Sequence, residues 1–529
     1  FFLYSFLLIS IIFLLTFFKI QIRHYIYSSL IPFVVNFHIS SLCVKVDAFY
    51  LCSIYTMVIC MLGYRNNDKR LQFYYIGAAF QVFITRNLNM QVIWIIVHLP
   101  ISILALQVAE ILNCTDFEFI SFFYTLGYLL EDTLLPPSRS FFAINDSTHL
   151  TPVLSVYLSE VCLLSVIVAT NTVPFCYHFL ISKLRMGVDQ ESSKDTFTPT
   201  NNKDNQWQEI LQRDLSIRLI LSGIITAIIL FSFTFPMIKN AINEDLFLWI
   251  GKMISTPIYI YTSIAWCCII ACSIIVTAMT RKQTSKTRIR KIFHLAVLVM
   301  FSPAIILSSL QSFLSLCLGV ALCMFILVEF IRCFLLANIA AISAIKGSLL
   351  DFIKTSSSIV DGFMNSFEEN NHSIALPTGL VFCKPIIFSH ISLLLGIAST
   401  IWIYCRFISS LGSQPIARDD DSRKVLLFLG LATVGVGDSA ASVFGSLYGV
   451  LKWSGTKKTL FGSFAAFVNM CWYSWIMQYV MDILTLRTSI CVMLTMALTA
   501  LAEAFTTEND NIYLPLYSMI IFLSLDKLF

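Results

Sequence analysis

Residues 258–278 read IYIYTSIAWCCIIACSIIVTA, a largely apolar run without a charged side chain. An α-helix needs about 20 such residues to cross the hydrocarbon core of a bilayer. The loop that follows, residues 281–291, carries six basic side chains and no acidic one. Because basic loops remain on the cytoplasmic side of a membrane, this pattern predicts a transmembrane helix, within a span at 246–278, that ends at the cytosolic face.

The same composition extends over the whole chain. Of its 529 residues, 57% are hydrophobic and only 12% are charged, whereas soluble domains carry roughly 25% charged residues. This excludes ordinary soluble, disordered and collagen-like proteins. The apolar runs are continuous and do not alternate as the strands of a membrane barrel do. The predicted fold class is therefore all-α, a polytopic integral membrane protein with about 13–15 transmembrane helices.

Charge and cysteine content argue against two other classes of function. The net charge is only +4, and the basic residues lie in short loops between apolar runs, so we expect no nucleic-acid partner. The 16 cysteines show no metal-binding spacing. Most lie inside apolar runs, as Cys267, Cys268 and Cys272 do, and are expected to pack as small hydrophobic residues. No protein partner can be inferred from these features.

A polar segment at 182–214 divides the chain. It separates an N-terminal multi-spanning region, 1–181, from a C-terminal multi-spanning region, 215–529. The chain starts at Phe1 instead of Met, so we expect its true start to be missing, and residues 2–20 are predicted to be a first span or signal anchor. No internal repeat of the kind found in inverted-repeat transporters is visible.

The predicted spans bring distant polar segments to one side of the membrane. The basic loop at 281–291 marks the cytosolic face. Three predicted pairs of spans, within 292–335, 379–436 and 460–505, each return the chain to that face. Four polar clusters are therefore expected to share it: Arg288–His294, Glu329–Arg332, Gly435–Gly462 and Glu503–Asn511.

The segment 433–462 has the strongest chemical signal. Residues 435–462 contain six of the 19 glycines in the chain. Gly435 and Gly437 are expected to permit tight turns. Asp438 is expected to cap a helix that begins at Ser439, and its carboxylate could hold Mg²⁺. The free N–H groups of that helix terminus would attract a phosphate.

Lys457, Lys458 and Thr459 add two cations and a hydroxyl, which also suit phosphate groups. The stretch 435–440 fits the dinucleotide-binding fingerprint, but that fingerprint requires a preceding strand, and the preceding run is predicted to be a membrane helix. A simpler alternative is that small residues at 441, 445 and 449, spaced by four, let two helices pack closely. This alternative leaves Asp438 and the lysine pair unexplained.

The segment resembles the CTP-binding segment of dolichol kinases in the pattern Asp438-x-x-Ala-Ser, Gly445, Gly449, Trp453, Lys457-Lys-Thr-x-x-Gly462. Four further blocks resemble that family in the same order: Arg290-Lys-Ile-Phe-His294, Glu329-Phe-Ile-Arg332, Ser389-His-Ile-Ser-Leu-Leu-Leu-Gly396, and Glu503 to Asn511 with Leu514-Pro-Leu516. Two features depart from the family. It usually has Glu where this chain has Phe461, and its acidic stretch is degraded here to Glu368-Glu-Asn-Asn371, followed at 372–383 by a segment without a counterpart.

The resemblance implies CTP-dependent phosphorylation of dolichol to dolichyl phosphate, the lipid carrier for protein glycosylation. It also implies an endoplasmic-reticulum membrane protein whose active site faces the cytosol. The expected cofactor is Mg²⁺ or another divalent cation. The expected partners are CTP as phosphoryl donor, dolichol or another polyprenol as acceptor, and membrane lipids.

The resemblance also implies roles for individual residues. The catalytic candidates are Asp438, Glu503 and Asp510, with Asp438 as the metal ligand. The candidates for CTP binding, in the loop 433–462, are Gly435, Gly437, Asp438, Ser439, Ala441, Ser442, Gly445, Gly449, Lys457, Lys458, Thr459 and Gly462. Other candidate site residues are Arg290, Lys291, His294, Glu329, Arg332, His390 and Asn511.

Each of these assignments has a simpler alternative. The basic residues at 290–294 could anchor a helix end at the membrane surface. Glu329 and Arg332, three residues apart, could form a local ion pair. Glu503 and Asp510 could bracket a solvated turn. For the whole chain, the alternatives are another CTP-dependent lipid kinase or cytidylyltransferase, such as a phytol or polyprenol kinase or a CDP-lipid synthase, and, less favoured, a transporter or scramblase.

Overall fold

The structure is a computed structural model, and all regular elements in the part it describes are helical, apart from one isolated bridge between Lys452 and Thr459. The described residues are 150–191, 217–242, 244–280, 286–332, 389–410, 420–454, 456, 458–505 and 510–528. The predicted first span, most of the predicted polar loop and Lys457 lie outside them.

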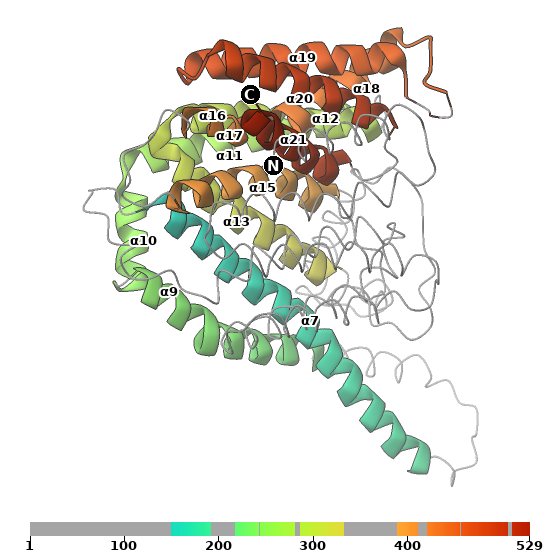
Figure 1. The fold of residues 1–529 in the computed structure, drawn as a ribbon. Helices are drawn as coiled ribbons and strands as arrows, with labels where there is room; N and C mark the ends of the chain where they lie inside the picture. The colour runs from blue at the N-terminus through green and yellow to red at the C-terminus, as the bar shows by residue number, and fades with distance from the viewer. Residues whose placement is uncertain are drawn as a thin grey trace.

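The helices are named as in Figure 1. The first group comprises α7 (Pro152–Glu191), η3 (Leu230–Thr234), α9 (Phe235–Ile242), α10 (Leu246–Ser255), α11 (Pro257–Thr280), α12 (Lys286–Ile306) and α13 (Ser308–Phe330). The second comprises α15 (Ser389–Ser410), α16 (Asp420–Arg423), α17 (Leu426–Gly430), η7 (Leu431–Gly437), α18 (Asp438–Tyr448), α19 (Leu460–Val480), α20 (Leu486–Phe505) and α21 (Asp510–Leu528). The elements η3 and η7 are π-helical.

Seven helices in the described ranges are long and apolar enough to cross a membrane. They are Pro152–Thr170, Ile217–Ile242, Pro257–Thr277, Ser308–Phe330, Leu426–Tyr448, Leu460–Val480 and Leu486–Phe505. The predicted all-helical, polytopic membrane architecture is therefore confirmed. The total of about 13–15 spans concerns the whole chain and stays a prediction.

The predicted span at 246–278 is divided into two helices. Asp245 caps α10 by accepting hydrogen bonds from the amides of Phe247 and Leu248. The α10 helix has 10 residues, too few to cross a bilayer, and α11 has 24. Pro257 begins α11, because proline lacks an N–H group and is tolerated at the first helical position.

The predicted turn at Gly435 and Gly437 is wrong. The elements α17, η7 and α18 form one continuous helical segment, and Gly437 and Asp438 have helical backbone angles (φ −61° and −62°). In a membrane every backbone N–H must be bonded within the protein, and a π-helical stretch absorbs an irregularity without breaking the helix. Asp438 therefore caps no helix, and the predicted phosphate site at a free helix terminus beginning at Ser439 does not exist.

The small residues of this segment bring α18 close to α19. A β-carbon on Gly445 would lie 2.9 Å from the Thr459 hydroxyl oxygen. One on Gly462 would lie 2.9 Å from the carbonyl oxygen of Ala441. This is the close backbone approach that small residues permit in membrane helices. The packing alternative, made for residues 441, 445 and 449, therefore describes Ala441 and Gly445, which face Gly462. A β-carbon on Gly449 would likewise lie 2.5 Å from the Thr459 hydroxyl oxygen.

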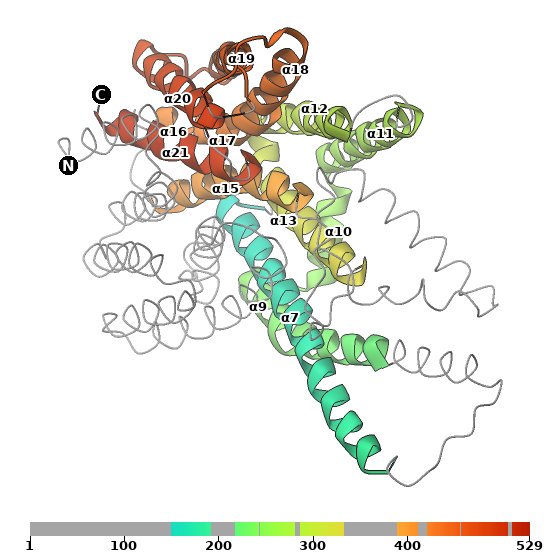
Figure 2. The same ribbon diagram turned by 90° about the vertical axis from the view of Figure 1, so that its right-hand side faces the viewer.

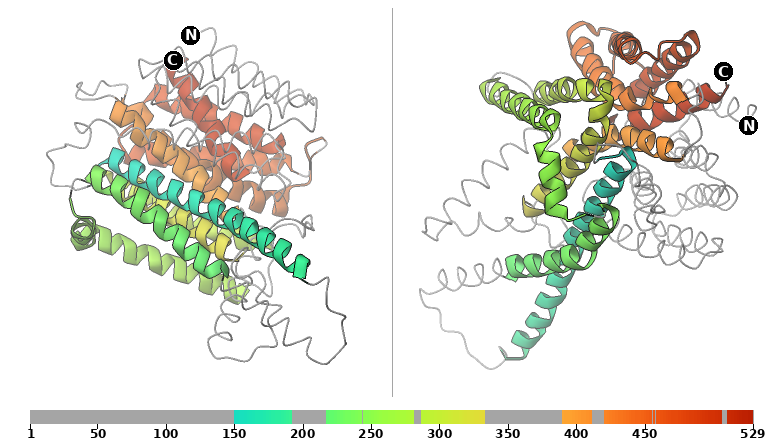
Figure 3. Two further views of the ribbon diagram at one scale, coloured as in Figure 1. Left: turned by 90° about the horizontal axis from the view of Figure 1, so that it is seen from below. Right: turned by 90° about the vertical axis from the view of Figure 1, so that its left-hand side faces the viewer.

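The helices around the core come from distant parts of the chain. Large side chains that are fully buried include Trp402 on α15, Phe428 on α17, and Tyr517 and Phe522 on α21. In Figure 1, α19 lies above α20 and α18, and α15 and α21 lie beneath them. Figure 2 shows α11 alongside α12, and Figure 3 shows α7 alongside α13; both pairs are in contact. The α12 helix also contacts α18 and η7.

We expect Gly396→Ala to destabilise the protein. A β-carbon at Gly396 on α15 would overlap the backbone carbonyl oxygen of Asn511 on α21, and relief of such overpacking costs about 1–3 kcal/mol. The thermal aggregation temperature of the purified protein in detergent measures the effect. Gly223→Ala is the matched control, because a β-carbon there meets nothing within 4 Å. Equal temperatures for the two variants would contradict the close contact between α15 and α21.

Candidate functional site

The first polar cluster surrounds Asp438 at the junction of α12 and α18. The Lys291 ammonium lies 2.5 Å from Asp438 Oδ2, and His294 Nε2 lies 3.3 Å from the same oxygen. Lys291 and His294 are three residues apart on α12 and share one face of that helix. All three side chains are at most 17% exposed. The charge of Asp438 is therefore balanced within the protein.

His294 is held on both sides of its ring. Its Nδ1 lies 2.9 Å from the carbonyl oxygen of Arg290, and its Nε2 lies 3.4 Å from Asn511 Oδ1 as well as near Asp438. Carbonyl and carboxylate oxygens can only accept hydrogen bonds. The contacts of both ring nitrogens fix the orientation of His294 and place Nε2 against Asp438.

The second polar cluster surrounds Lys458. Its ammonium lies 2.8 Å from Glu503 Oε1 and 3.1 Å from Asp510 Oδ2, and it donates a hydrogen bond of 2.6 Å to the Glu503 carbonyl. Burial opposes the charge of Lys458, but Asp510 and Glu503 outweigh it, so the pKa of Lys458 lies above its usual value. Lys458 is thus a cation with two carboxylate partners, Glu503 and Asp510, whose side chains it brings together.

Asp510 has one carboxylate oxygen in use and one free. Its Oδ2 binds Lys458, whereas its Oδ1 is buried and has no hydrogen-bond partner within the described ranges. Burial raises the pKa of Asp510 to about 7; Lys458 opposes this shift, and the charges of Asp438 and Glu503 add to it. A carboxyl group with a free oxygen and a pKa near neutrality suits proton transfer.

Asn511 connects the two clusters. It follows Asp510 directly, its Oδ1 lies 3.4 Å from His294, and its Nδ2 donates a 3.4 Å hydrogen bond to the Ser392 hydroxyl on α15. The structure therefore brings together three of the four predicted polar clusters, those at 288–294, 435–462 and 503–511. Ser392 was missed; its only sequence signal is a polar side chain two residues after His390 in an apolar run.

The fourth predicted cluster, Glu329–Arg332, forms a separate group with His390 on α13 and α15. Arg332 donates hydrogen bonds of 3.1 and 2.7 Å from Nε and Nη2 to Glu329 Oε2, which is the local ion pair considered above. His390 Nε2 lies 3.9 Å from Glu329 Oε1, and its ring is 5.1 Å from that of Phe325. All three polar side chains are buried.

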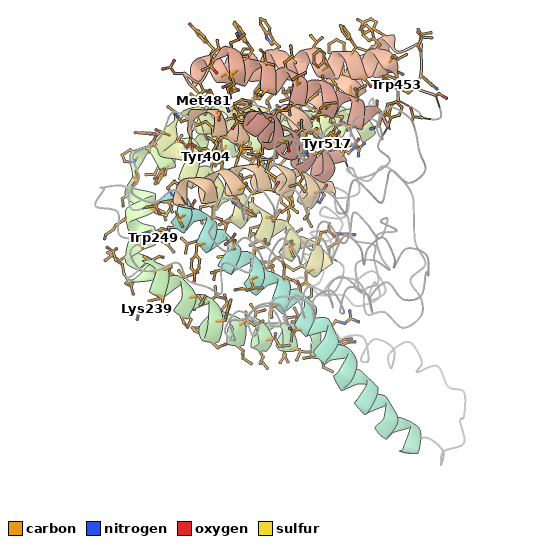
Figure 4. All side chains as sticks on the ribbon, viewed as in Figure 1. Lys239, Trp249, Tyr404, Trp453, Met481 and Tyr517 are labelled. Carbon is orange, nitrogen blue, oxygen red and sulfur yellow. The ribbon has the colours of Figure 1, made fainter. Side chains whose placement is uncertain are left out.

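The loop between α18 and α19 folds back on itself. The amide of Trp453 donates to the Lys458 carbonyl, and the amide of Leu460 donates to the Leu451 carbonyl. Thr459 caps α19 by accepting a 3.1 Å hydrogen bond from the Gly462 amide. This loop delivers Lys458 to the site, and the labelled Trp453 marks it in Figure 4.

Three other predicted residues, and Phe461, have less specific surroundings. Ser439 has a buried hydroxyl oxygen that no described group bonds. Gly449 follows the last turn of α18 in an extended conformation. Ser442 lies half-buried on α18. Phe461, the departure from the family pattern, is half-exposed and packs edge-on against Tyr448.

The donors suit a divalent cation only if a ligand completes its coordination. No group of three or more His, Cys, Asp or Glu side chains in the described part could hold a metal alone. The contacts of Lys291 and His294 with Asp438 are to Oδ2, and no described residue donates a hydrogen bond to Oδ1. Mg²⁺ is commonly bound by one or two carboxylates together with substrate phosphates. Asp438 fits that pattern.

Comparison with known proteins gives the site a context. No family model and no solved structure matches the chain. The chain is 26% identical over 316 residues to a dolichol kinase of Bos taurus, covering 58% of this chain and 52% of that one. It is 28% identical over 288 residues to one of Arabidopsis thaliana (53% and 43%). It is 34% identical over 149 residues to one of Schizosaccharomyces pombe (27% and 26%).

The chain spans about half the length of the mammalian relative. A yeast dolichol kinase from Saccharomyces cerevisiae matches a similar share, at 26% identity over 303 residues. The similarity thus extends across animals, plants and fungi, and the chain is homologous to the dolichol kinases of eukaryotes.

Proposed function

We propose that this chain catalyses CTP + dolichol → CDP + dolichyl phosphate. The homology supports this activity, and one structural observation suggests which residues perform it. Asp438, Lys458 and Asp510, from three separate segments, meet in a partly buried cluster through the contacts of Lys291, His294 and Asn511. We also propose the endoplasmic-reticulum membrane as its location, the cytosolic face as the side of the site, and protein glycosylation as the use of its product.

The balance of charges in this cluster suits phosphoryl transfer. Such a reaction depends mainly on positioning and on neutralising phosphate charge. Lys458 is a cation that could turn from its carboxylate partners toward the phosphates of CTP, while Lys291 adds positive charge beside Asp438. Lys457, the neighbour of Lys458, is proposed to add a third charge, and Ser439 a hydroxyl donor.

A divalent cation, once bound, would neutralise charge on the transferring phosphates. Asp438 would hold it through Oδ1, while Lys291 and His294 hold the orientation of the carboxylate through Oδ2. Asp510 would take the proton of the dolichol hydroxyl on its free Oδ1. Before CTP binds, Lys458 holds the other oxygen of Asp510, which leaves Oδ1 as the free one.

The glycines of the proposed CTP-binding loop have an indirect role in this scheme. Gly445, Gly449 and Gly462 let α18 and Thr459 approach closely, which places the loop carrying Lys458. Gly435 and Gly437 lie in the π-helical turn that leads into Asp438. Arg290 contributes a backbone carbonyl to His294. Glu329, Arg332 and His390 are proposed to support the α13–α15 wall beside Ser392.

Purified protein incubated with labelled CTP and dolichol should release CDP and dolichyl phosphate in equal amounts. Asp438→Asn should reduce turnover to background, because it removes the negative charge proposed to hold the cation. The side-chain volume hardly changes, so the variant should still fold. Asp482→Asn is the matched control: this exposed aspartate has φ 56°, a conformation that Asn also tolerates. Equal elution volumes of both variants verify folding.

Other products would change the assignment. Pyrophosphate in place of CDP would identify a cytidylyltransferase, and phosphorylation of a different alcohol would identify another CTP-dependent lipid kinase. Absence of any CTP consumption would favour a transporter or scramblase. Full activity of Asp438→Asn would remove Asp438 from the reaction.

Lys458→Ala should weaken apparent CTP affinity by roughly 10- to 150-fold, because loss of a charge-assisted hydrogen bond costs about 1.5–3 kcal/mol. The KM for dolichol should change less. Lys452→Ala is the control, since Lys452 lies in the same loop with an exposed side chain and has no ion pair within the described residues. Initial rates at varied CTP measure the effect. An unchanged KM for CTP in Lys458→Ala would assign this lysine a structural role.

Asp510→Asn should lower kcat by about 100-fold or more, the range of general base catalysis, with little change in the KM for CTP. Glu503→Gln should lower kcat less, because the amide can still accept a hydrogen bond from Lys458. Single-turnover rates with bound CTP separate this effect from nucleotide affinity. A larger loss in Glu503→Gln than in Asp510→Asn would transfer the role of base to Glu503.

A further inference from the structure

A second candidate binding site lies apart from the polar clusters. A cavity of about 540 Å³ opens between α7, α9, α10, α11 and α13. Its walls are almost entirely aliphatic or aromatic, and include Leu158, Trp249, Met253, Tyr259, Phe313 and Leu316. Figure 4 labels Trp249 on α10, at the side of the bundle away from Trp453. Walls without charge provide no partner for a nucleotide or a lipid head group.

Aromatic contacts connect this cavity to the C-terminal half of α12. Tyr259 and Phe313, both in the cavity wall, stack with ring centroids 4.4 Å apart. Phe313 also stacks on Trp266 at 5.9 Å, and Trp266 donates a 2.9 Å hydrogen bond to the Met300 carbonyl of α12. These contacts hold the cavity beside a defined level of α12.

The polar site lies toward the opposite end of the same helix. Lys291 and His294 are in the first half of α12, and Met300 is nine positions after Lys291. At a rise of 1.5 Å per residue, about 14 Å of helix separates Lys291 from Met300, and the cavity lies beyond Met300, across Trp266 and Phe313. A molecule with its head group at Asp510 and an apolar chain along α12 could occupy both places, whereas a short alcohol could not.

We propose that the cavity binds the isoprenoid chain of the acceptor, several isoprene units from its hydroxyl. This inference rests on the proposed function for the identity of the lipid. An uncharged cavity of this volume matches a branched hydrocarbon chain, and its link through Phe313 and Trp266 to the helix that carries Lys291 and His294 fits one molecule whose hydroxyl is at the polar cluster. The cavity would then help to select acceptors by chain length.

Photo-crosslinking tests the assignment without requiring turnover. A polyprenol with a diazirine on a distal isoprene unit should label the segments that line the cavity, and excess dolichol should suppress the labelling. Leu316→Trp, which fills the cavity, should reduce the yield about tenfold, the effect of altering a hydrophobic pocket. Competition by phosphatidylcholine as strong as that by dolichol would overturn the proposal in favour of ordinary membrane lipid.

Two more variants protect the test against misfolding of Leu316→Trp. Ile264→Trp narrows the cavity from α11, where Ile264 is 56% exposed. Ile275→Trp is its matched control on the same helix, 57% exposed and not part of the cavity wall. The yield should fall in Ile264→Trp and stay unchanged in Ile275→Trp. Unchanged yields in both cavity variants would refute the site.

The two proposals can fail separately. If wild-type protein consumes no CTP with any polyprenol while the distal crosslink persists and responds to Leu316→Trp, the kinase assignment fails and the chain-binding cavity stands. If CDP is released normally and kcat/KM for dolichol is unchanged in both cavity variants, the kinase assignment stands and the cavity has no role in acceptor binding.

Discussion

The paired charge of Asp438 is the interaction on which the arrangement of the site depends. A carboxylate in an apolar, helical bundle is costly unless cations and hydrogen bonds surround it. Lys291 and His294 supply them from α12, and this requirement fixes α12 against α18. Because His294 also contacts Asn511, the start of α21 is drawn to the same point, and Asn511 in turn reaches Ser392 on α15. Side chains from α12, α15, α18 and α21 are thus linked to Asp438 by one series of contacts.

The π-helical stretch before Asp438 determines how that acid is presented. A regular α-helix through 431–437 would rotate Asp438 to another direction, since each residue added to a helix turns the following side chains. Gly437 lies within this stretch, where a β-carbon would come within 2.6 Å of the Met470 sulfur on α19. Gly437 therefore permits close contact between helices, and this packing determines the direction in which the backbone presents Asp438 to Lys291 and His294.

Sequence reasoning predicted the fold class and the convergence of distant segments, because hydropathy and basic loops report directly on membrane crossing. It placed 288–294, 435–462 and 503–511 together, and the contacts of Lys458 and Asn511 confirm that proximity. It misread Gly435 and Gly437, since glycine favours turns and close helix packing equally well. The ion pairs of Lys458 were also beyond prediction, because they depend on the exact path of a loop. The break at Pro257 was missed because hydropathy averages over a short interruption.

The ion pairs of Lys458 have a consequence for how tightly the site can hold a nucleotide. Its ammonium already has Glu503 and Asp510 as counter-ions, so a phosphate that displaces them gains only the difference between new and old contacts. On the proposed function, the same carboxylates can reclaim the lysine once the terminal phosphoryl group has left. Internal counter-ions of this kind keep the affinity for product low and its dissociation fast, so the resting charge balance favours repeated turnover over tight binding.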